Sequence, residues 1–314
     1  MLRVVGLRLA LSVGIVLLVV FVLFVLSRML SGDPATMALG PRATQEMREA
    51  FAVEMGLDRS VPVQFVAYVR GLLSGDLGAD FLSGRPVLVM IGETLPHTII
   101  LAVTSISWAV ALGVLVGVQA ALHPGDWIDR VTALTSVALI ALPPFVIGIY
   151  ILILGAIVLD WFPASGLGEG PVDYLHHLVL PSITVGSAWV GYIARIVRAA
   201  LVEELGSPYV RTATAFGLSR RRIAMRQCLR IAILPVITLI AGGIGFLLSS
   251  SVFAEVIFSR PGMGTMIYDA VLTRNYAVAQ GGVLAATIMF VALTLAADLT
   301  ISALDPRTRL QGFR

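Results

Sequence analysis

Side chains that could bind a charged partner are concentrated between Tyr209 and Pro235, a segment with six arginines and no acidic residue. Guanidinium groups pair with carboxylates and phosphates, so this segment could contact anionic lipid, nucleic acid or an acidic protein surface. The chain lacks the hydrolase patterns GxSxG and HExxH, and it also lacks the nucleotide-binding pattern GxxxxGK[ST]. The residues therefore indicate binding rather than hydrolysis by this chain.

Metal binding is disfavoured by the spacing of the residues that could ligate an ion. Cys228 is the one cysteine in the sequence, which excludes an intramolecular disulfide and a site with several cysteines. His176 and His177 are adjacent, and neighbouring side chains on a helix point about 100° apart. We therefore expect no metal bound by this chain.

Composition places these residues in a membrane protein with an all-α fold. Hydrophobic residues make up 58% of the chain and charged residues 13%, whereas a soluble domain has about 25% charged residues. Uncharged runs long enough to cross about 30 Å of hydrocarbon recur, and lipid requires them to be helical. We predict one transmembrane domain, residues 1–314. Its six transmembrane helices are predicted at residues 9–29, 97–122, 131–158, 177–197, 231–255 and 282–304.

The distribution of arginines predicts that both termini are cytoplasmic. All 22 basic residues are arginine. Segments on the side of the termini contain 14 arginines and five acidic residues, and segments on the opposite side contain eight and 12. Because arginine favours the cytoplasmic side, residues 31–95 are predicted to form an external loop and residues 198–230 a cytoplasmic loop.

The predicted external loop contains helical signals. Ser60 can cap a helix with Pro62 in its first turn, and the preceding sequence ATQEMREAFAVEM has helical spacing. We therefore expect a small helical cap on the outer face.

Small and helix-breaking residues mark three of the predicted spans. Small residues recur every four positions in the second span, which favours close helix packing; they are Ala109, Gly113, Gly117 and Ala121. Consecutive prolines at 143 and 144 interrupt the third span and leave a fixed kink and a hinge both open. Ser249, Ser250 and Ser251 in the fifth span either pack against neighbours or line a pathway.

The cationic segment has an internal order that membrane topology alone does not require. Ser207 and Pro208 are typical of a helix start, and Gly217 is typical of a left-handed helix end. Ser219 can cap a second helix that continues into the fifth span. The segment is therefore predicted to be a protruding elbow, although its arginines also suit anionic lipid. Nucleic acid is disfavoured, because aromatic residues are not interleaved with the arginines and both ends enter the membrane.

The order of residues in this elbow resembles the cytoplasmic loop of ABC-importer permeases. The matching pattern is Tyr209-Val-Arg211-Thr212-Ala213-x-Ala215-x-Gly217-Leu218-Ser219, followed by Leu234-Pro235. Four further stretches are similar to the dipeptide, oligopeptide and nickel branch of that family: SGDPA, GLDRSVPVQFVAYVRGLLSGDLGADF, EVIFSRPGMGTMIYDAVLTRNY and DLTISALDPRTR. The resemblance covers nearly the whole chain, and the long first outer loop matches the first of the two permease subunits of that branch.

The sequence departs from the wider family at three positions of the elbow. Arg211, Thr212 and Ala213 occupy positions where the wider family has Glu-Ala-Ala. The departure is consistent with the peptide branch, and it leaves open which contact replaces that of the glutamate.

The resemblance implies one subunit of an ATP-driven importer in the bacterial inner membrane, forming half of a pathway that works by alternating access. The implied partners are a second homologous permease, two cytosolic ATPase subunits or domains that bind ATP and magnesium, an external substrate-binding protein and membrane lipid. We expect no nucleic-acid partner and no cofactor bound by this chain. The implied ATPase-coupling residues are Tyr209, Arg211, Thr212, Ala213, Ala215, Gly217, Leu218 and Ser219.

Two carboxylates lie at or near membrane depth and are candidates for function. Glu255, at the outer end of the fifth span, is either part of an outer gate or an interfacial carboxylate. Asp298, near the inner end of the sixth span, is predicted to be structural. The C-terminal residues Asp305, Pro306 and Arg307 are assigned the same role.

Two alternatives to an importer subunit remain at this stage. The first is a membrane channel or sensor without ATP coupling, in which the elbow would have no partner. The second is an intramembrane hydrolase, which is disfavoured because this chain lacks the motifs GxSxG and HExxH. Within the importer family, the sequence leaves the cargo open among dipeptides, longer peptides, glutathione-like compounds and nickel chelates.

Overall fold

The computed structural model describes residues 2–29, 44–54 and 59–304, and their regular structure is helical apart from one isolated bridge between Ala79 and Pro86. The chain divides into two compact units, Met1–Thr94 with Met266–Leu295 and Leu95–Thr265 with Ala296–Arg314. Among the described residues, five helices are long and apolar enough to cross a membrane, and a sixth crossing results if one bent pair counts as a single span. The prediction of an all-helical membrane protein is therefore confirmed at this level.

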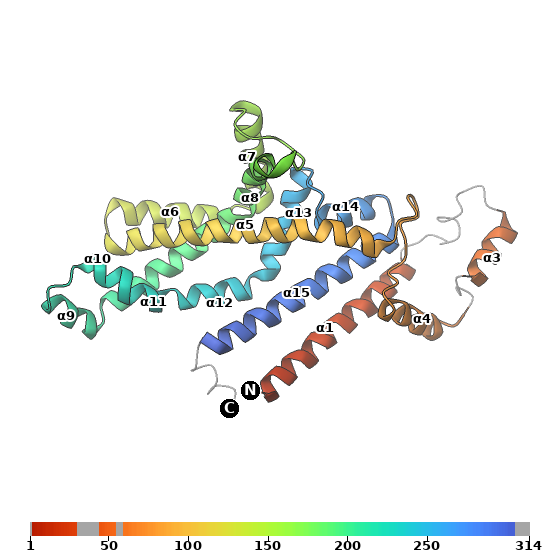
Figure 1. Ribbon diagram of the computed structural model, residues 1–314, viewed down its shortest axis with the longest axis horizontal. Coiled ribbons are helices and arrows are strands. Elements are labelled where there is room, and N and C mark those ends of the chain that lie inside the picture. Colours follow the sequence, from red (N-terminus) through yellow and green to blue (C-terminus); the bar gives the residue numbers. More distant parts are fainter. Residues whose placement is uncertain (1, 30–43, 55–58, 305–314) are drawn as a thin grey trace. The chain divides into compact units, whose positions relative to one another are not determined.

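The first unit contains α1 (Leu2–Met29), α3 (Gln45–Glu54), α4 (Val61–Leu73) and most of α15 (Tyr276–Leu304), which are labelled in Figure 1. As predicted, Ser60 precedes α4 and Pro62 lies in its first turn. Aromatic contacts join α4 to α1, with the Phe65 ring centroid 5.1 Å from that of Phe24. The parts of the predicted cap at residues 31–43 and 55–58 lie outside the described residues.

A buried carboxylate ties the loop after α4 to the start of α15. Asp80 accepts a hydrogen bond from the Leu82 amide at 3.0 Å, and it also accepts hydrogen bonds from the Ser83 hydroxyl and the Asn275 side chain. The Ser83 hydrogen bond is the main cause that lowers the pKa of Asp80 below its usual value. The carboxylate therefore stays ionised at neutral pH and fixes this loop.

The second unit is built around α8 (Gly170–Leu205), whose residues are buried along most of the helix. Helix α5 (Val87–Leu122) begins in the first unit, and its part from Leu95 onward packs against α8. Helices α6 (Trp127–Ala141) and α7 (Pro144–Leu152) also pack against α8. A side chain at Gly113 would place its Cβ 2.8 Å from Ile193, and one at Gly117 would lie 2.7 Å from the Ala194 carbonyl oxygen. The predicted close packing of the small-residue stripe is confirmed, and its partner is α8.

The third predicted span is sharply bent at its two prolines. Leu142 has an extended backbone, as expected before a proline, and Pro144 begins α7. The α6 axis makes an angle of 101° with the following helix, which consists of α7 and the π-helical turn η1 (Ile153–Val158). The prolines therefore produce a corner, which is a larger deviation than the kink considered from the sequence.

The fifth predicted span is also interrupted, at a residue that the sequence did not single out. Helix α12 (Leu234–Gly242) ends and α13 (Ile244–Ile257) begins around Gly243, whose backbone has φ −100° and ψ 7°. A Cβ at Gly243 would lie 2.2 Å from the buried Trp189 ring. The glycine leaves room for the indole where the two helices meet.

Candidate functional site

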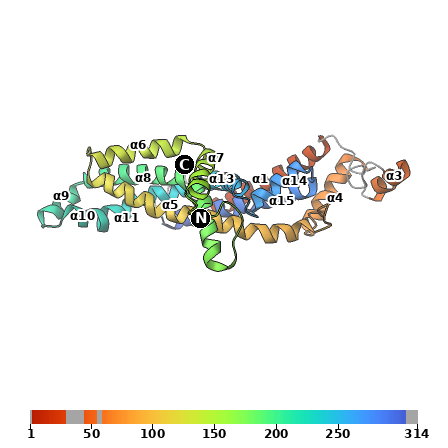
Figure 2. The ribbon, with the colours of Figure 1, turned by 90° about the horizontal axis from the view of Figure 1, so that it is seen from above.

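The predicted elbow is present and begins directly after α8. Helix α9 (Pro208–Ala215) follows α8 after Gly206 and Ser207, and Figures 1 and 2 both show it at one extremity of the second unit. Ser207 occupies the expected N-cap position, but its hydroxyl donates to the Glu204 carbonyl oxygen at 2.7 Å rather than capping α9. The serine therefore joins α9 to the end of α8.

Gly217 ends α9 in the left-handed conformation predicted for it, with φ +82°. The Gly217 amide donates to the Thr214 carbonyl at 2.9 Å, and the Leu218 amide donates to the Ala213 carbonyl at 3.2 Å. This pair of hydrogen bonds is the Schellman arrangement, which requires a positive φ at the glycine. A Cβ at Gly217 would have no neighbour within 4 Å, so the requirement for glycine is conformational rather than steric.

The two faces of α9 differ in exposure. Val210 is buried, and Ala213 and Leu218 pack against the core of the second unit. The opposite face exposes Arg211, Thr212 and Ala215, and Ser219, which follows the turn at Gly217, is also exposed. Phe216 follows the last residue of α9, and its side chain is 83% exposed. An exposed aromatic beside exposed cations is suited to contact with a protein partner.

Tyr209 anchors the base of the elbow. Its hydroxyl donates to the Glu204 carboxylate at 2.9 Å and contacts the Cys228 sulfur at 3.4 Å. Partial desolvation of the hydroxyl, followed by its hydrogen bonds to Cys228 and Glu204, raises the pKa of Tyr209. The neutral phenol therefore links α9 to the end of α8 and to the segment around Cys228.

The second helix of the elbow is less regular than predicted. Ser219 precedes α10 (Arg220–Ile223), which continues through a π-helical turn, η2 (Ala224–Cys228), into α11 (Leu229–Ala232). Ile223, Ala224 and Cys228 are buried, while Arg220, Arg221 and Arg222 are exposed. The π turn adjusts the helix so that its apolar residues reach the core.

Glu255 forms the centre of a second cluster, at the end of α13. The carboxylate is 1% exposed and accepts hydrogen bonds from Thr98 Oγ1 at 2.6 Å and the Gly264 amide at 2.7 Å. Thr98 in turn accepts from the Met263 amide at 2.9 Å. A Cβ at Gly262 would lie 2.1 Å from the Glu255 carboxyl carbon. Glu255 thus fastens the loop that follows α13 to α5, and a side chain at Gly262 would disturb this contact.

Arg260 is a buried charge that the sequence reasoning did not single out. The guanidinium donates to the His177 carbonyl at 3.2 Å and lies 5.3 Å from the centre of the Tyr174 ring. Burial lowers the pKa of Arg260. Its position three residues after the end of α13 gave no signal, because arginines are usually exposed.

The three predicted serines of the fifth span differ in exposure. Ser250 and Ser251 are buried and donate back to the Phe246 and Leu247 carbonyls, whereas Ser249 is exposed. Asp298 lies in α15. Asp305, Pro306 and Arg307 lie outside the described residues. His176 and His177 bond to different carbonyl groups, those of Trp161 and Asp173.

Comparison with known proteins identifies the class to which this fold belongs. Residues 109–310 match the binding-protein-dependent transport system inner membrane component, and residues 1–102 match the N-terminal region of such membrane components. The chain belongs to this family and is the permease component of an ABC importer, a multi-pass protein of the inner membrane. The family membership predicted from the sequence is therefore confirmed.

Individual relatives cover almost the whole chain. It is 33% identical to the probable peptide ABC transporter permease protein y4tP of Sinorhizobium fredii, over 96% of this chain and 97% of that protein. It is 34% identical to the glutathione transport system permease protein GsiC of Salmonella typhimurium, over 93% of this chain and 94% of that protein. The fold is similar to a chain of the MetNI methionine ABC transporter in an inward-facing conformation, with a TM-score of 0.54 and 16% identity over 69% of this chain and 97% of that chain.

Proposed function

We propose that this chain forms half of the import pathway for a peptide or a peptide-like solute such as glutathione. The proposal is supported by relatives over 90% of the chain that are named as peptide and glutathione permeases. The other half would come from a second homologous permease, and an external binding protein would deliver the solute. Nickel chelates are the runner-up cargo, since they are imported by other members of the branch that the sequence resembles.

The geometry of α9 supports a role in coupling this permease to an ATPase. The helix is fixed to α8 through Ser207 and Tyr209, and it presents Arg211, Thr212 and Phe216 on its exposed face. A short helix held in this way can transmit the closure of an ATPase dimer to the transmembrane helices as a rigid-body motion. Separate ATPase subunits would bind ATP and magnesium and perform the hydrolysis.

Reconstitution of the complete complex tests this proposal. Proteoliposomes containing both permeases, the ATPases and the binding protein should accumulate labelled glutathione or a labelled dipeptide when ATP is supplied. A complex whose ATPases carry an alanine in place of the Walker lysine should not. Solute flux that persists without ATP, or a permease that does not retain the ATPases on purification, would instead favour a channel.

The proposed topology places both termini and residues 198–230 in the cytoplasm and residues 31–95 outside. We expect Arg220→Cys, in a Cys228→Ser background, to react with a membrane-impermeant maleimide only after the membrane is opened. Gln64→Cys in the same background should react in intact spheroplasts. Labelling of Arg220→Cys from outside would contradict this orientation.

A further inference from the structure

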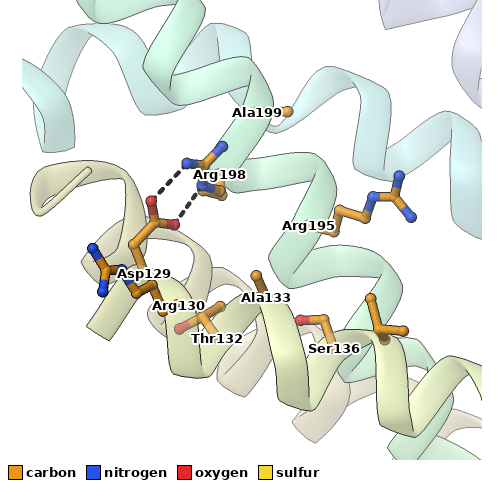
Figure 3. A pocket seen from close by; sticks show the side chains of 9 residues that line it. Asp129, Arg130, Thr132, Ala133, Ser136, Arg195, Arg198 and Ala199 are labelled. Atoms are coloured by element: carbon orange, nitrogen blue, oxygen red, sulfur yellow. Dashed lines mark hydrogen bonds and ion pairs between the residues drawn. The ribbon is translucent and has the colours of Figure 1, made fainter. Parts of the chain in front are cut away.

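A cleft of about 370 Å³ lies between α6 and α8, away from both clusters described above. Its walls carry three arginines, Arg130, Arg195 and Arg198, and one carboxylate, Asp129. Figure 3 shows these side chains together with the small residues Ala133 and Ala199, which also line the cleft. The cleft residues are separate from the exposed face of α9 and from the Glu255 cluster.

One arginine is already neutralised by the carboxylate. Arg198 donates to Asp129 through Nε at 2.6 Å and through Nη2 at 2.7 Å, and the Gly125 amide donates to Asp129 at 2.9 Å. Figure 3 shows the Arg198 guanidinium facing Asp129, while the Arg195 guanidinium projects away from this pair. Within the described ranges, neither Arg130 nor Arg195 makes an ion pair or a hydrogen bond through its side chain. The cleft therefore has an uncompensated positive charge.

Two hydroxyl groups in the cleft add neutral donors. Thr132 is 6% exposed and Ser136 is 4% exposed. Thr135 on the same helix donates to the Val131 carbonyl at 2.8 Å, but the Thr132 and Ser136 hydroxyls make no hydrogen bond to any residue that the structure describes. Guanidinium groups together with free hydroxyl donors suit the oxygens of a phosphate group.

The surroundings of the cleft favour a lipid as the source of that phosphate. One wall, α8, is a helix long and apolar enough to cross a membrane, and the other, α6, is the first half of the bent pair that together has the length and composition of a span. Val137 lines the cleft and has a highly exposed side chain, as does Leu134, which lies one helical turn earlier on α6 at the edge of the cleft. A small soluble phosphate compound would leave these apolar side chains exposed, whereas the acyl chains of a lipid would cover them.

We propose that the α6–α8 cleft binds the phosphate of an anionic phospholipid, with Arg130 and Arg195 as its cationic partners and the acyl chains along Val137 and Leu134. Basic pockets between transmembrane helices recognise anionic headgroups in this way. On the proposed topology the site faces the cytoplasmic leaflet. The bound lipid would neutralise the cleft and fill the space between the two helices.

Native mass spectrometry of the delipidated permease complex tests this site directly. The protein is titrated with phosphatidylglycerol, with phosphatidylethanolamine of the same acyl chains, and with soluble glycerol 3-phosphate. We expect specific retention of phosphatidylglycerol. Each arginine near a membrane surface contributes roughly a fivefold change in affinity, so Arg130→Gln/Arg195→Gln should weaken retention by about 25-fold.

Matched variants separate this site from general charge effects. Arg220→Gln/Arg221→Gln removes the same charge from exposed positions on α10 and should leave retention unchanged, as should Arg130→Lys/Arg195→Lys. Ala133→Phe keeps every charge but fills the cleft and should lower retention. The proposal is overturned if the Arg130→Gln/Arg195→Gln variant retains the lipid like the unmodified protein, if the phosphatidylethanolamine control binds equally well, or if only glycerol 3-phosphate binds. None of these readouts depends on transport or on ATPase docking, so they are independent of the proposed function.

Discussion

Replacement of Gly217 by valine is expected to leave the permease in the membrane while separating ATP hydrolysis from transport. The residue has φ +82°, and a β-branched side chain in that conformation costs about 1–2 kcal/mol or more. Relaxation of this strain would break the Schellman hydrogen bonds of Thr214 and Ala213 and turn α9 relative to α8. We expect substrate-stimulated hydrolysis to fall several-fold in reconstituted complexes, with fewer ATPase subunits retained.

Three substitutions serve as controls for this effect. Gly217→Asn should be close to the unmodified protein, because asparagine tolerates the left-handed conformation. Gly217→Ala should be intermediate. Arg220→Ala should be mild, since it removes one exposed arginine among several. Wild-type ATPase retention and stimulated hydrolysis in Gly217→Val would show that this turn does not couple the two subunits.

Glu255→Ala is expected to destabilise the end of α13 and the loop that follows it. The substitution leaves the Thr98 hydroxyl and the Gly264 amide without their buried acceptor, and each orphaned group costs about 1–3 kcal/mol. We expect a lower melting temperature and a lower folded yield in detergent. Glu255→Gln retains the size of the side chain and one acceptor oxygen, so its effect should be smaller.

Ser249→Ala is the matched control for Glu255, because Ser249 lies on the same helix but is exposed. It should not change the melting temperature. The measurement also separates a structural role of Glu255 from a gating role. A Glu255→Ala protein with unchanged stability and abolished transport per folded molecule would contradict the structural assignment and favour the gate.

Local signals in the sequence predicted the elbow because its geometry is set by neighbouring residues. Pro208 fixes a helix start, and Gly217 permits the left-handed turn. The stripe from Ala109 to Ala121 was equally predictable, since residues four apart share a helix face. In each case the signal is local in the sequence, although the stripe did not reveal that its packing partner is α8.

Features that depend on distant residues were missed. The interruption at Gly243 is explained by the Trp189 ring, which lies 54 positions earlier in the chain. The burial of Arg260 depends on Tyr174 and His177. The exposure of Phe216 was not predictable either, because an aromatic before a glycine is equally compatible with a buried helix end. A single sequence does not reveal which distant side chain occupies a given space.

The close contact of Gly113 and Gly117 with α8 has a mechanical consequence. Because α5 and α8 are in close contact at two successive turns, sliding of one helix along the other would cause steric collisions, and we expect the two helices to move together. Only Gly206 and Ser207 separate α8 from α9. We therefore expect a displacement of the elbow to be transmitted directly to α8 and α5. If the second unit bends during transport, we expect the bending at its two helix breaks, the corner at Leu142–Pro143 and the interruption at Gly243.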